Sequence, residues 1–145
     1  MTDLMYTEVV MDHFQNPRNV GTIDDPDGVG KEGSPVCGDL MEYYIKVDDG
    51  RITDIKFRTF GCGAAVASAS MGTELALGMT LEEAMALTDE QVIHALGGLP
   101  EVKTHCSNLA ATTLHTAIRD YLSRHPEVRL GTEEQDSAEP GQSSA

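Results

Sequence analysis

A change of hydrophobic period between residues 40 and 60 constrains the fold more than any other feature of this chain. In the run LMEYYIKV, positions 40–47, polar and apolar residues alternate, and one face of the strand collects Met41, Tyr43, Ile45 and Val47. The run RITDIKFRTF, positions 51–60, alternates in the same way and places Ile55, Phe57 and Thr59 together. Between them stands Asp-Gly, a strong hairpin signal. The sequence therefore predicts an antiparallel hairpin with one buried face.

Helices are predicted after the hairpin, between residues 64 and 124. The small-residue run AAVASASMGTELAL, positions 64–77, predicts a helix that lies close against the sheet and stops at Gly78. Thr80 and Thr88 each begin a capping box, so two short helices start near residues 81 and 89, and Gly97-Gly98 ends the second. A last helix is expected from about Ser107 to Arg124, with an inward face made of Leu109, Ala110, Thr113, Leu114, Ala117, Ile118 and Tyr121.

The first 36 residues contain one helical pattern and one long loop. Residues 3–14 predict a helix that ends at Asn16-Pro17, with an apolar stripe of Met5, Val9 and Val10 widened by Tyr6, His13 and Phe14. His13 is expected to face the Asn16-Pro17 turn. Residues 19–36 are rich in Gly, Asp and Pro and predict a loop with at most a weak edge strand around 29–33. The fold class is therefore α+β, with a small, about three-stranded antiparallel sheet and helices packed on one face.

The charge of the chain limits its partners. There are 24 acidic and 10 basic residues, for a formal net charge of −14. Residues 131–145 carry acids but no base and no apolar anchor, so we expect a folded domain over 1–128 and an acidic, disordered tail over 129–145. Phosphate backbones would repel so acidic a body, which argues against nucleic-acid binding.

Neither a membrane span nor a disulfide framework is expected. No run is long and apolar enough to cross a bilayer, and MTDLMYTEVV lacks the basic region and cleavage site of a signal peptide. We therefore expect a cytoplasmic protein. Three cysteines cannot close a disulfide framework, and a reducing compartment keeps them as thiols.

Each cysteine stands at the boundary of a predicted element, where side chains stay reachable. Cys37 and Asp39 come just before the strand at 40, Cys62 stands between two glycines at a strand-to-helix corner, and His105 and Cys106 come at a helix start. A helix N-terminus favours negative charge, so Cys62 and Cys106 are expected to have lowered thiol pKa values. Thiolate is the form that binds metal and attacks sulfur.

The alternative for each cysteine is structural. A lone cysteine is most often a small buried hydrophobe, and no C-x-x-C pair of a zinc ribbon is present. Glycines on both sides of Cys62 and second candidate ligands beside the other two cysteines argue against three core residues. The five candidate ligands at three corners favour one assembled site.

Four segments in register resemble the IscU/NifU family of iron–sulfur cluster assembly scaffolds: DHFQNPRNVG, PVCGDLM, FGCGAAVASAS and VKTHCSNLA. The resemblance covers roughly residues 5 to 123. It implies a scaffold rather than an enzyme with turnover, on which a [2Fe–2S] cluster forms from iron and from the persulfide sulfur of a cysteine desulfurase. Electrons reduce the sulfur, and the cluster then passes to apo acceptor proteins.

The resemblance also implies roles for individual residues. The family's cysteine ligands fall on Cys37, Cys62 and Cys106, its aspartate associated with cluster lability falls on Asp39, and its histidine falls on His105. The fourth place is open between Asp39 and His105. The position of Cys106 after Lys103 and His105 predicts the persulfide acceptor, and Lys103 is the nearest basic group.

Two departures from the family pattern concern the proteins with which this chain is expected to interact. The branch served by a dedicated Hsp70 chaperone carries Leu-Pro-Pro-Val-Lys where this chain has Leu99-Pro100-Glu101-Val102-Lys103, which leaves chaperone recognition open. The stretch from Cys62 to Cys106 has no room for the insertion typical of the SufU branch. Two other functions remain, a zinc-bound sulfur acceptor for a desulfurase and a structural zinc domain, because zinc takes the same ligands. A homodimer of the cluster-loaded form also stays open.

Overall fold

The computed structural model describes residues 7–34, 39–61, 63–98 and 109–126. In chain order the elements are α1 (Glu8–Gln15), β1 (Gly28–Ser34), β2 (Asp39–Asp48), β3 (Arg51–Phe60), α2 (Gly63–Ala76), α3 (Leu81–Ala86), α4 (Asp89–Ala95) and α6 (Ala110–Arg124). The three strands form one antiparallel sheet in the order β1-β2-β3. The predicted α+β class with a three-stranded antiparallel sheet is confirmed.

The β2–β3 hairpin forms where the alternation of apolar residues predicts it. Asp49 and Gly50 make the turn with positive φ angles of 55° and 76°, a conformation that suits a two-residue hairpin loop. The register shifts between Lys46 and Val47, and this irregularity brings Ile52 as well as Ile55 to the buried face. The buried face of the two strands consists of Met41, Tyr43, Ile45, Ile52, Ile55 and Phe57.

β1 is longer and more regular than its composition indicates. The strand GVGKEGS pairs along its whole length with β2, although glycine is a poor strand former. Tertiary packing explains it, because α6 lies directly on this backbone. A Cβ atom on Gly28 would overlap the carbonyl oxygen of Ala117, and one on Gly30 would overlap that of Thr113. The sequence therefore underestimated this strand: β1 extends over Gly28–Ser34, beyond the weak edge strand expected around 29–33.

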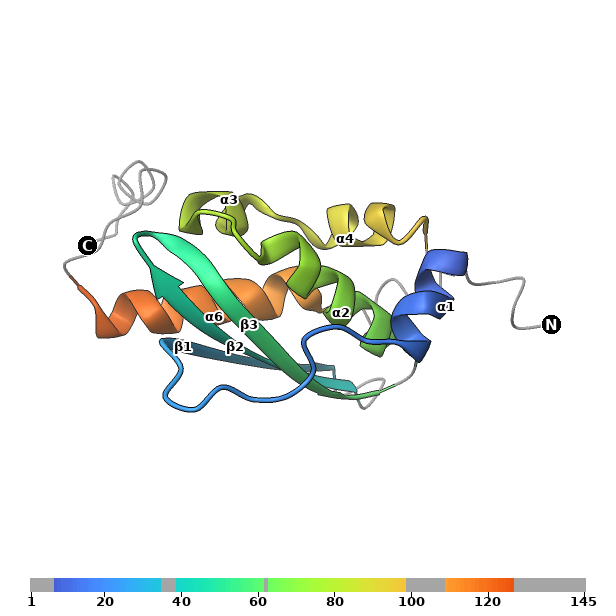
Figure 1. The fold of residues 1–145 in the computed structure, drawn as a ribbon, viewed down its shortest axis with the longest axis horizontal. Coiled ribbons are helices and arrows are strands. Elements are labelled where there is room, and N and C mark those ends of the chain that lie inside the picture. The colour runs from blue at the N-terminus through green and yellow to red at the C-terminus, as the bar shows by residue number, and fades with distance from the viewer. Residues whose placement is uncertain (1–6, 35–38, 62, 99–108, 127–145) are drawn as a thin grey trace.

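The helices form two layers above one face of the sheet (Figure 1). α2 packs on β3 and β2, and α6 packs on β1 and β2. α3 and α4 lie over these two helices, on the side away from the sheet. The capping boxes of Thr80 and Thr88 are both present, and Gly78, Gly97 and Gly98 have the positive φ angles that end α2 and α4. These predictions from the sequence are confirmed.

α1 packs on α2 with a narrower face than the sequence indicates. Among its described residues only Val10 and His13 are buried, whereas Val9 and Phe14 are 39% and 45% exposed. The prediction that Val9 and Phe14 belong to the buried stripe was wrong, because in the described part of the chain α1 packs mainly on α2, through the face that carries Val10 and His13. After α1, Asn19 and Gly21 form backbone hydrogen bonds with Phe57 and cover part of the open edge of β3.

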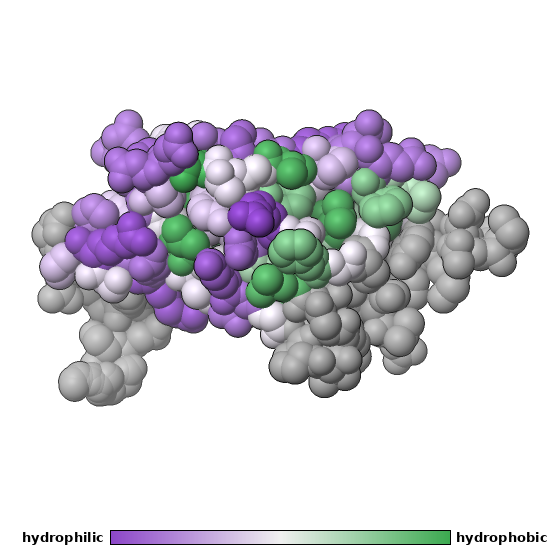
Figure 2. All heavy atoms as spheres, turned by 90° about the horizontal axis from the view of Figure 1, so that it is seen from below, coloured by the Kyte–Doolittle hydropathy of each residue, from purple (hydrophilic) through white to green (hydrophobic). Residues whose placement is uncertain are grey.

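The surface seen in Figure 2 mixes hydrophobic and hydrophilic side chains. Small green patches alternate with purple groups, and no continuous hydrophobic band is visible in this view. The large hydrophobic side chains exposed in the described chain are Val9, Phe14, Val20, Phe60 and Leu77. None of the described helices combines the length and apolarity that a membrane span requires.

Candidate functional site

Most of the residues predicted to form the site are not among those that the structure describes. Cys37, Cys62, Lys103, His105 and Cys106 fall outside the described residues. Asp39 is the first residue of β2, where the structure describes its backbone. Among the residues that are described, no cluster of three or more His, Cys, Asp or Glu side chains could hold a metal ion. The predicted ligand set therefore stays a prediction.

The described chain ends that lead to these residues meet at one end of the sheet (Figure 1). β1 ends at Ser34, whose register partner is Asp39 at the start of β2. At the same end of the sheet, Leu40 of β2 pairs with Phe60, the last residue of β3. α2 starts three residues later, at Gly63. The gaps that contain Cys37 and Cys62 therefore open at the same place.

α6 begins at this end as well, because it runs antiparallel to β1. Gly30 faces Thr113 in the first half of the helix, whereas Gly28, at the start of the strand, faces Tyr121 near the helix end. The gap before Leu109, which contains His105 and Cys106, therefore opens where β1 ends. All three cysteine-bearing gaps share one end of the fold.

The ring of Phe14 packs against the start of α2. Phe14 lies against Gly63, and a Cβ atom at this glycine would come within 3.1 Å of the ring. Phe60, at the end of β3, is 61% exposed. The glycine after Cys62 thus has a packing reason, which is the close approach of Phe14.

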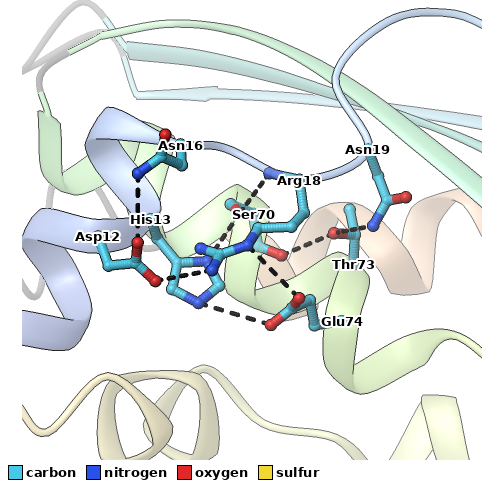
Figure 3. A network of polar contacts seen from close by, with 8 residues as sticks. All are labelled: Asp12, His13, Asn16, Arg18, Asn19, Ser70, Thr73 and Glu74. Atoms are coloured by element: carbon cyan, nitrogen blue, oxygen red, sulfur yellow. Dashed lines mark hydrogen bonds and ion pairs between the residues drawn. The ribbon is translucent and has the colours of Figure 1, made fainter.

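A polar network joins α1 and the following loop to the middle of α2 (Figure 3). The backbone N–H of Arg18 donates to Ser70 Oγ at 2.9 Å, and Ser70 Oγ lies 2.7 Å from His13 Nδ1. We assign the Ser70 hydroxyl as the donor to Nδ1, because Ser70 Oγ already accepts from Arg18, and this leaves the His13 proton on Nε2. Nε2 lies 3.5 Å from Glu74 Oε1. In this tautomer the Nε2 proton points toward the Glu74 carboxylate.

Arg18 completes the network on its exposed side. Its guanidinium contacts Asp12 at 2.7 Å and Glu74 at 3.6 Å, and the hydrogen bond to Arg18 holds the pKa of the Asp12 carboxyl below its usual value. Asn19 Nδ2 donates to Thr73 Oγ1 at 2.9 Å. The segment from α1 to Asn19 is thus fixed to α2, the helix that follows Cys62.

His13 itself is a correction to the sequence analysis. It does not face the Asn16-Pro17 turn but lies 3% exposed between α1 and α2, against Ser70. Sequence reasoning missed this pairing because Ser70 stands 57 residues away on a helix of small residues. The available signal was the polar residue at the centre of that small-residue helix, which needs a partner when buried.

Burial lowers the pKa of His13, and Arg18 lowers it further, against the opposing effect of Glu74. Below its unfolded pKa, near 6.5, the unfolded chain takes up a proton that the folded chain refuses. We therefore expect the free energy of unfolding to be fully retained above this pH and to fall as the pH drops toward the folded pKa. Urea unfolding between pH 7.5 and about pH 5 measures this slope.

The control for this prediction is His13→Asn, whose amide oxygen can accept the Ser70 hydrogen bond but does not titrate. We expect this variant to be less stable than the native chain and to depend less steeply on pH. Equal slopes for the two proteins would show that His13 does not cause the pH dependence.

The described structure is an α+β domain in which the chain ends that lead to the three cysteines meet at one end of the sheet. The fold matches that of solved structures. A crystal structure of a hypothetical protein has a TM-score of 0.66 at 30% identity, over 82% of this chain and 99% of that chain. The N-terminal part of a nitrogen-fixing NifU-like protein from Brucella abortus has a TM-score of 0.56 at 26% identity, over 86% of this chain and 84% of that chain.

Sequence comparison gives the family. The model of the NifU-like N terminal domain matches residues 5–128. The iron-sulfur cluster assembly scaffold protein IscU 1 of Archaeoglobus fulgidus is 61% identical over 124 residues, which are 86% of this chain and 81% of that protein. The chain belongs to the IscU/NifU-like family of iron–sulfur cluster assembly scaffold proteins.

Proposed function

We propose that this chain assembles a [2Fe–2S] cluster on Cys37, Cys62 and Cys106 and passes it to acceptor proteins. The observation that carries the proposal is the 61% identity over 124 residues to a protein named as a cluster assembly scaffold. Thiolates are the soft ligands that an iron–sulfur cluster needs. A scaffold of this kind works by binding and release, not by turnover of a substrate.

Covalent reach supports a shared site for the three thiols. An extended chain spans at most about 3.6 Å per residue, so the Cα of Cys106 stays within about 11 Å of the Cα of Leu109. By the same limit the Cα of Cys37 stays within about 7 Å of that of Asp39, and Cys62 is joined directly to Gly63. Each of these anchors lies at the end of the sheet where β1 ends.

The fourth ligand is proposed to be Asp39 or His105. Either is a harder or more readily displaced ligand than a fourth thiolate, so the cluster can be released. Sulfur enters at Cys106 as a persulfide, with Lys103 as the nearest basic group. In the isolated protein, zinc can occupy the same ligands.

The partners follow from this chemistry. A cysteine desulfurase supplies sulfur, iron and electron donors complete the cluster, and apo iron–sulfur proteins accept it in a reducing, cytoplasmic setting. Whether the cluster-loaded form is a homodimer, and whether an Hsp70-type chaperone binds the chain, are separate questions that this function does not decide.

Anaerobic incubation with ferrous iron, cysteine and a cysteine desulfurase tests the proposed function. We expect thiolate-to-iron charge-transfer absorption and about equal amounts of protein-bound iron and sulfide. Mass spectrometry without iron should find the added sulfur on Cys106. Zinc retention with persulfide but no cluster would favour the sulfur-acceptor function, and persulfide confined to Cys37 would contradict the assignment of Cys106.

The proposed assembly does not require the acidic C-terminal tail. We expect deletion of residues 131–145 to leave the rate of cluster assembly and the melting temperature unchanged within error, because this acidic stretch has no apolar anchor. The measurements are cluster absorbance over time and thermal unfolding of the two metal-free proteins. A large loss of assembly would show that the acidic stretch is a docking element.

A further inference from the structure

Asp89 makes a contact that its place in a capping box does not explain. It is the first residue of α4, yet its carboxylate accepts hydrogen bonds from the start of α6. Asp89 Oδ1 accepts from the backbone N–H of Ala111 at 2.9 Å, and Oδ2 accepts from the Thr112 hydroxyl at 3.1 Å. One side chain therefore joins the first turns of two helices.

α6 needs such a partner. Its N-cap residue is Leu109, which has no side-chain acceptor, and no side-chain hydrogen bond is made from the N-cap position. The first N–H groups of a helix have no partner within the helix, and a negative charge beside them is favourable. Asp89 supplies both the acceptor and the charge from another helix.

The two helices joined by Asp89 border one segment of the chain. α4 leads through Gly97 and Gly98 into residues 99–108, and the described chain resumes at Leu109, just before α6. Fixing both ends of a segment lowers the number of conformations open to it. A carboxylate that ties α4 to the first turn of α6 therefore restrains where this segment leaves and where it rejoins the fold.

We propose that Asp89 is a positioning residue, which fixes the first turn of α6 as the anchor from which Cys106 reaches a metal ion. The proposal rests on the proposed function in that it takes Cys106 as a ligand. Asp89 acts through the Ala111 and Thr112 contacts and is not itself a ligand.

Both helices have core contacts of their own, so the Asp89 contact is not needed to hold either helix in the fold. Val92 and Leu96 hold α4 in the core, and Leu114 and Ile118 hold α6, all with no exposed surface. We expect these residues to stay packed when Asp89 is replaced. The expected effect is therefore confined to the first turn of α6 rather than spread over the helix.

The test compares Asp89→Ala, Asp89→Asn and the control Glu90→Ala in the full chain. Glu90 is the next residue, is exposed, and carries the same charge in the same first turn. Asparagine keeps an oxygen that can accept from the Ala111 N–H, so it should rescue most of the contact. Amide hydrogen exchange reports on the helix, and anaerobic titration with Co²⁺ reports the thiolate–metal absorption without any cluster chemistry.

In Asp89→Ala we expect the Ala111 amide to exchange about 5 to 30 times faster, with the amides around Ile118 unchanged. Co²⁺ should bind about tenfold more weakly, the effect of losing a group that orients a ligand. Asp89→Asn and Glu90→Ala should stay close to the native chain in both readouts.

Two results would overturn the proposal. One is equal exchange of Ala111 in Asp89→Ala and Glu90→Ala, which would show that the contact does not fix the helix start. The other is faster exchange throughout α6, which would make Asp89 an ordinary stabilising residue. A native chain that binds Co²⁺ but builds no cluster would count against the proposed function alone, because the Asp89 comparison uses only Co²⁺.

Discussion

Replacing Cys37, Cys62 or Cys106 with serine is expected to reduce the iron and sulfide retained after anaerobic assembly by at least about tenfold in each case. Changing a residue that only orients a ligand already costs 10- to 100-fold in metal affinity, so loss of a thiolate ligand should cost no less. The serine hydroxyl is a hard donor that stays protonated at neutral pH. Iron and sulfide analysis after gel filtration measures the loss.

The melting temperatures of the metal-free variants provide the control. They should stay near that of the native chain if the cysteines serve the metal and not the core. A variant that retains the native iron and sulfide content would remove that cysteine from the ligand set. A variant that unfolds in the absence of metal would assign its cysteine to the core.

Gly30→Ala is expected to have the largest effect on stability. The added methyl group would overlap the Thr113 carbonyl oxygen and the backbone of Ala117, so α6 must move away from the sheet. Overpacking of this kind costs about 3 kcal/mol when backbone has to shift, which corresponds to a fall of about 10 °C in melting temperature. Thermal unfolding of the metal-free protein gives the value directly.

Lys31→Ala is the matched control for Gly30→Ala. Lys31 is the next residue of β1, and its side chain is 62% exposed. We expect a change of no more than about 0.5 kcal/mol for this exposed position. Equal melting temperatures for Gly30→Ala and Lys31→Ala would mean that α6 does not press on the β1 backbone.

Local patterns explain why much of the fold could be predicted. The β2–β3 hairpin follows from alternation and from Asp49-Gly50, and the starts of α3 and α4 follow from Thr80 and Thr88. Each of these features is decided by residues close together in the sequence. Local preference and final structure agree there.

The features that the sequence did not predict depend on distant contacts. β1 is a full strand because its glycines let α6 approach, and glycine by itself predicts the opposite. His13 is buried because Ser70 meets it from α2. Asp89 reads as part of a capping box, and only the packing of α4 beside α6 shows its second contact.

The candidate site, like the fold, could be predicted from the sequence only in part. The sequence predicts the cysteines at element boundaries, and the structure shows that the ends of β1 and β3 and the starts of β2, α2 and α6 lie together, with α6 beginning at Ala110. The ligand set and the choice between Asp39 and His105 depend on side chains that the structure does not describe. Those remain predictions for experiment.

The decay of the assembled cluster in Asp39→Ala tests most directly whether the chain is a scaffold that releases its cluster. Asp39 begins β2 at the end of the sheet where the cysteine-bearing gaps open, and Asp48→Ala, at the exposed other end of β2, is the control. If Asp39 is a hard, exchangeable ligand, its loss removes a route for water or an incoming thiol. We therefore predict slower loss of cluster absorbance, and slower transfer to an apo-ferredoxin, than in the native chain and in Asp48→Ala. Faster loss of metal together with a lower melting temperature would contradict the account and assign the site to structural metal binding.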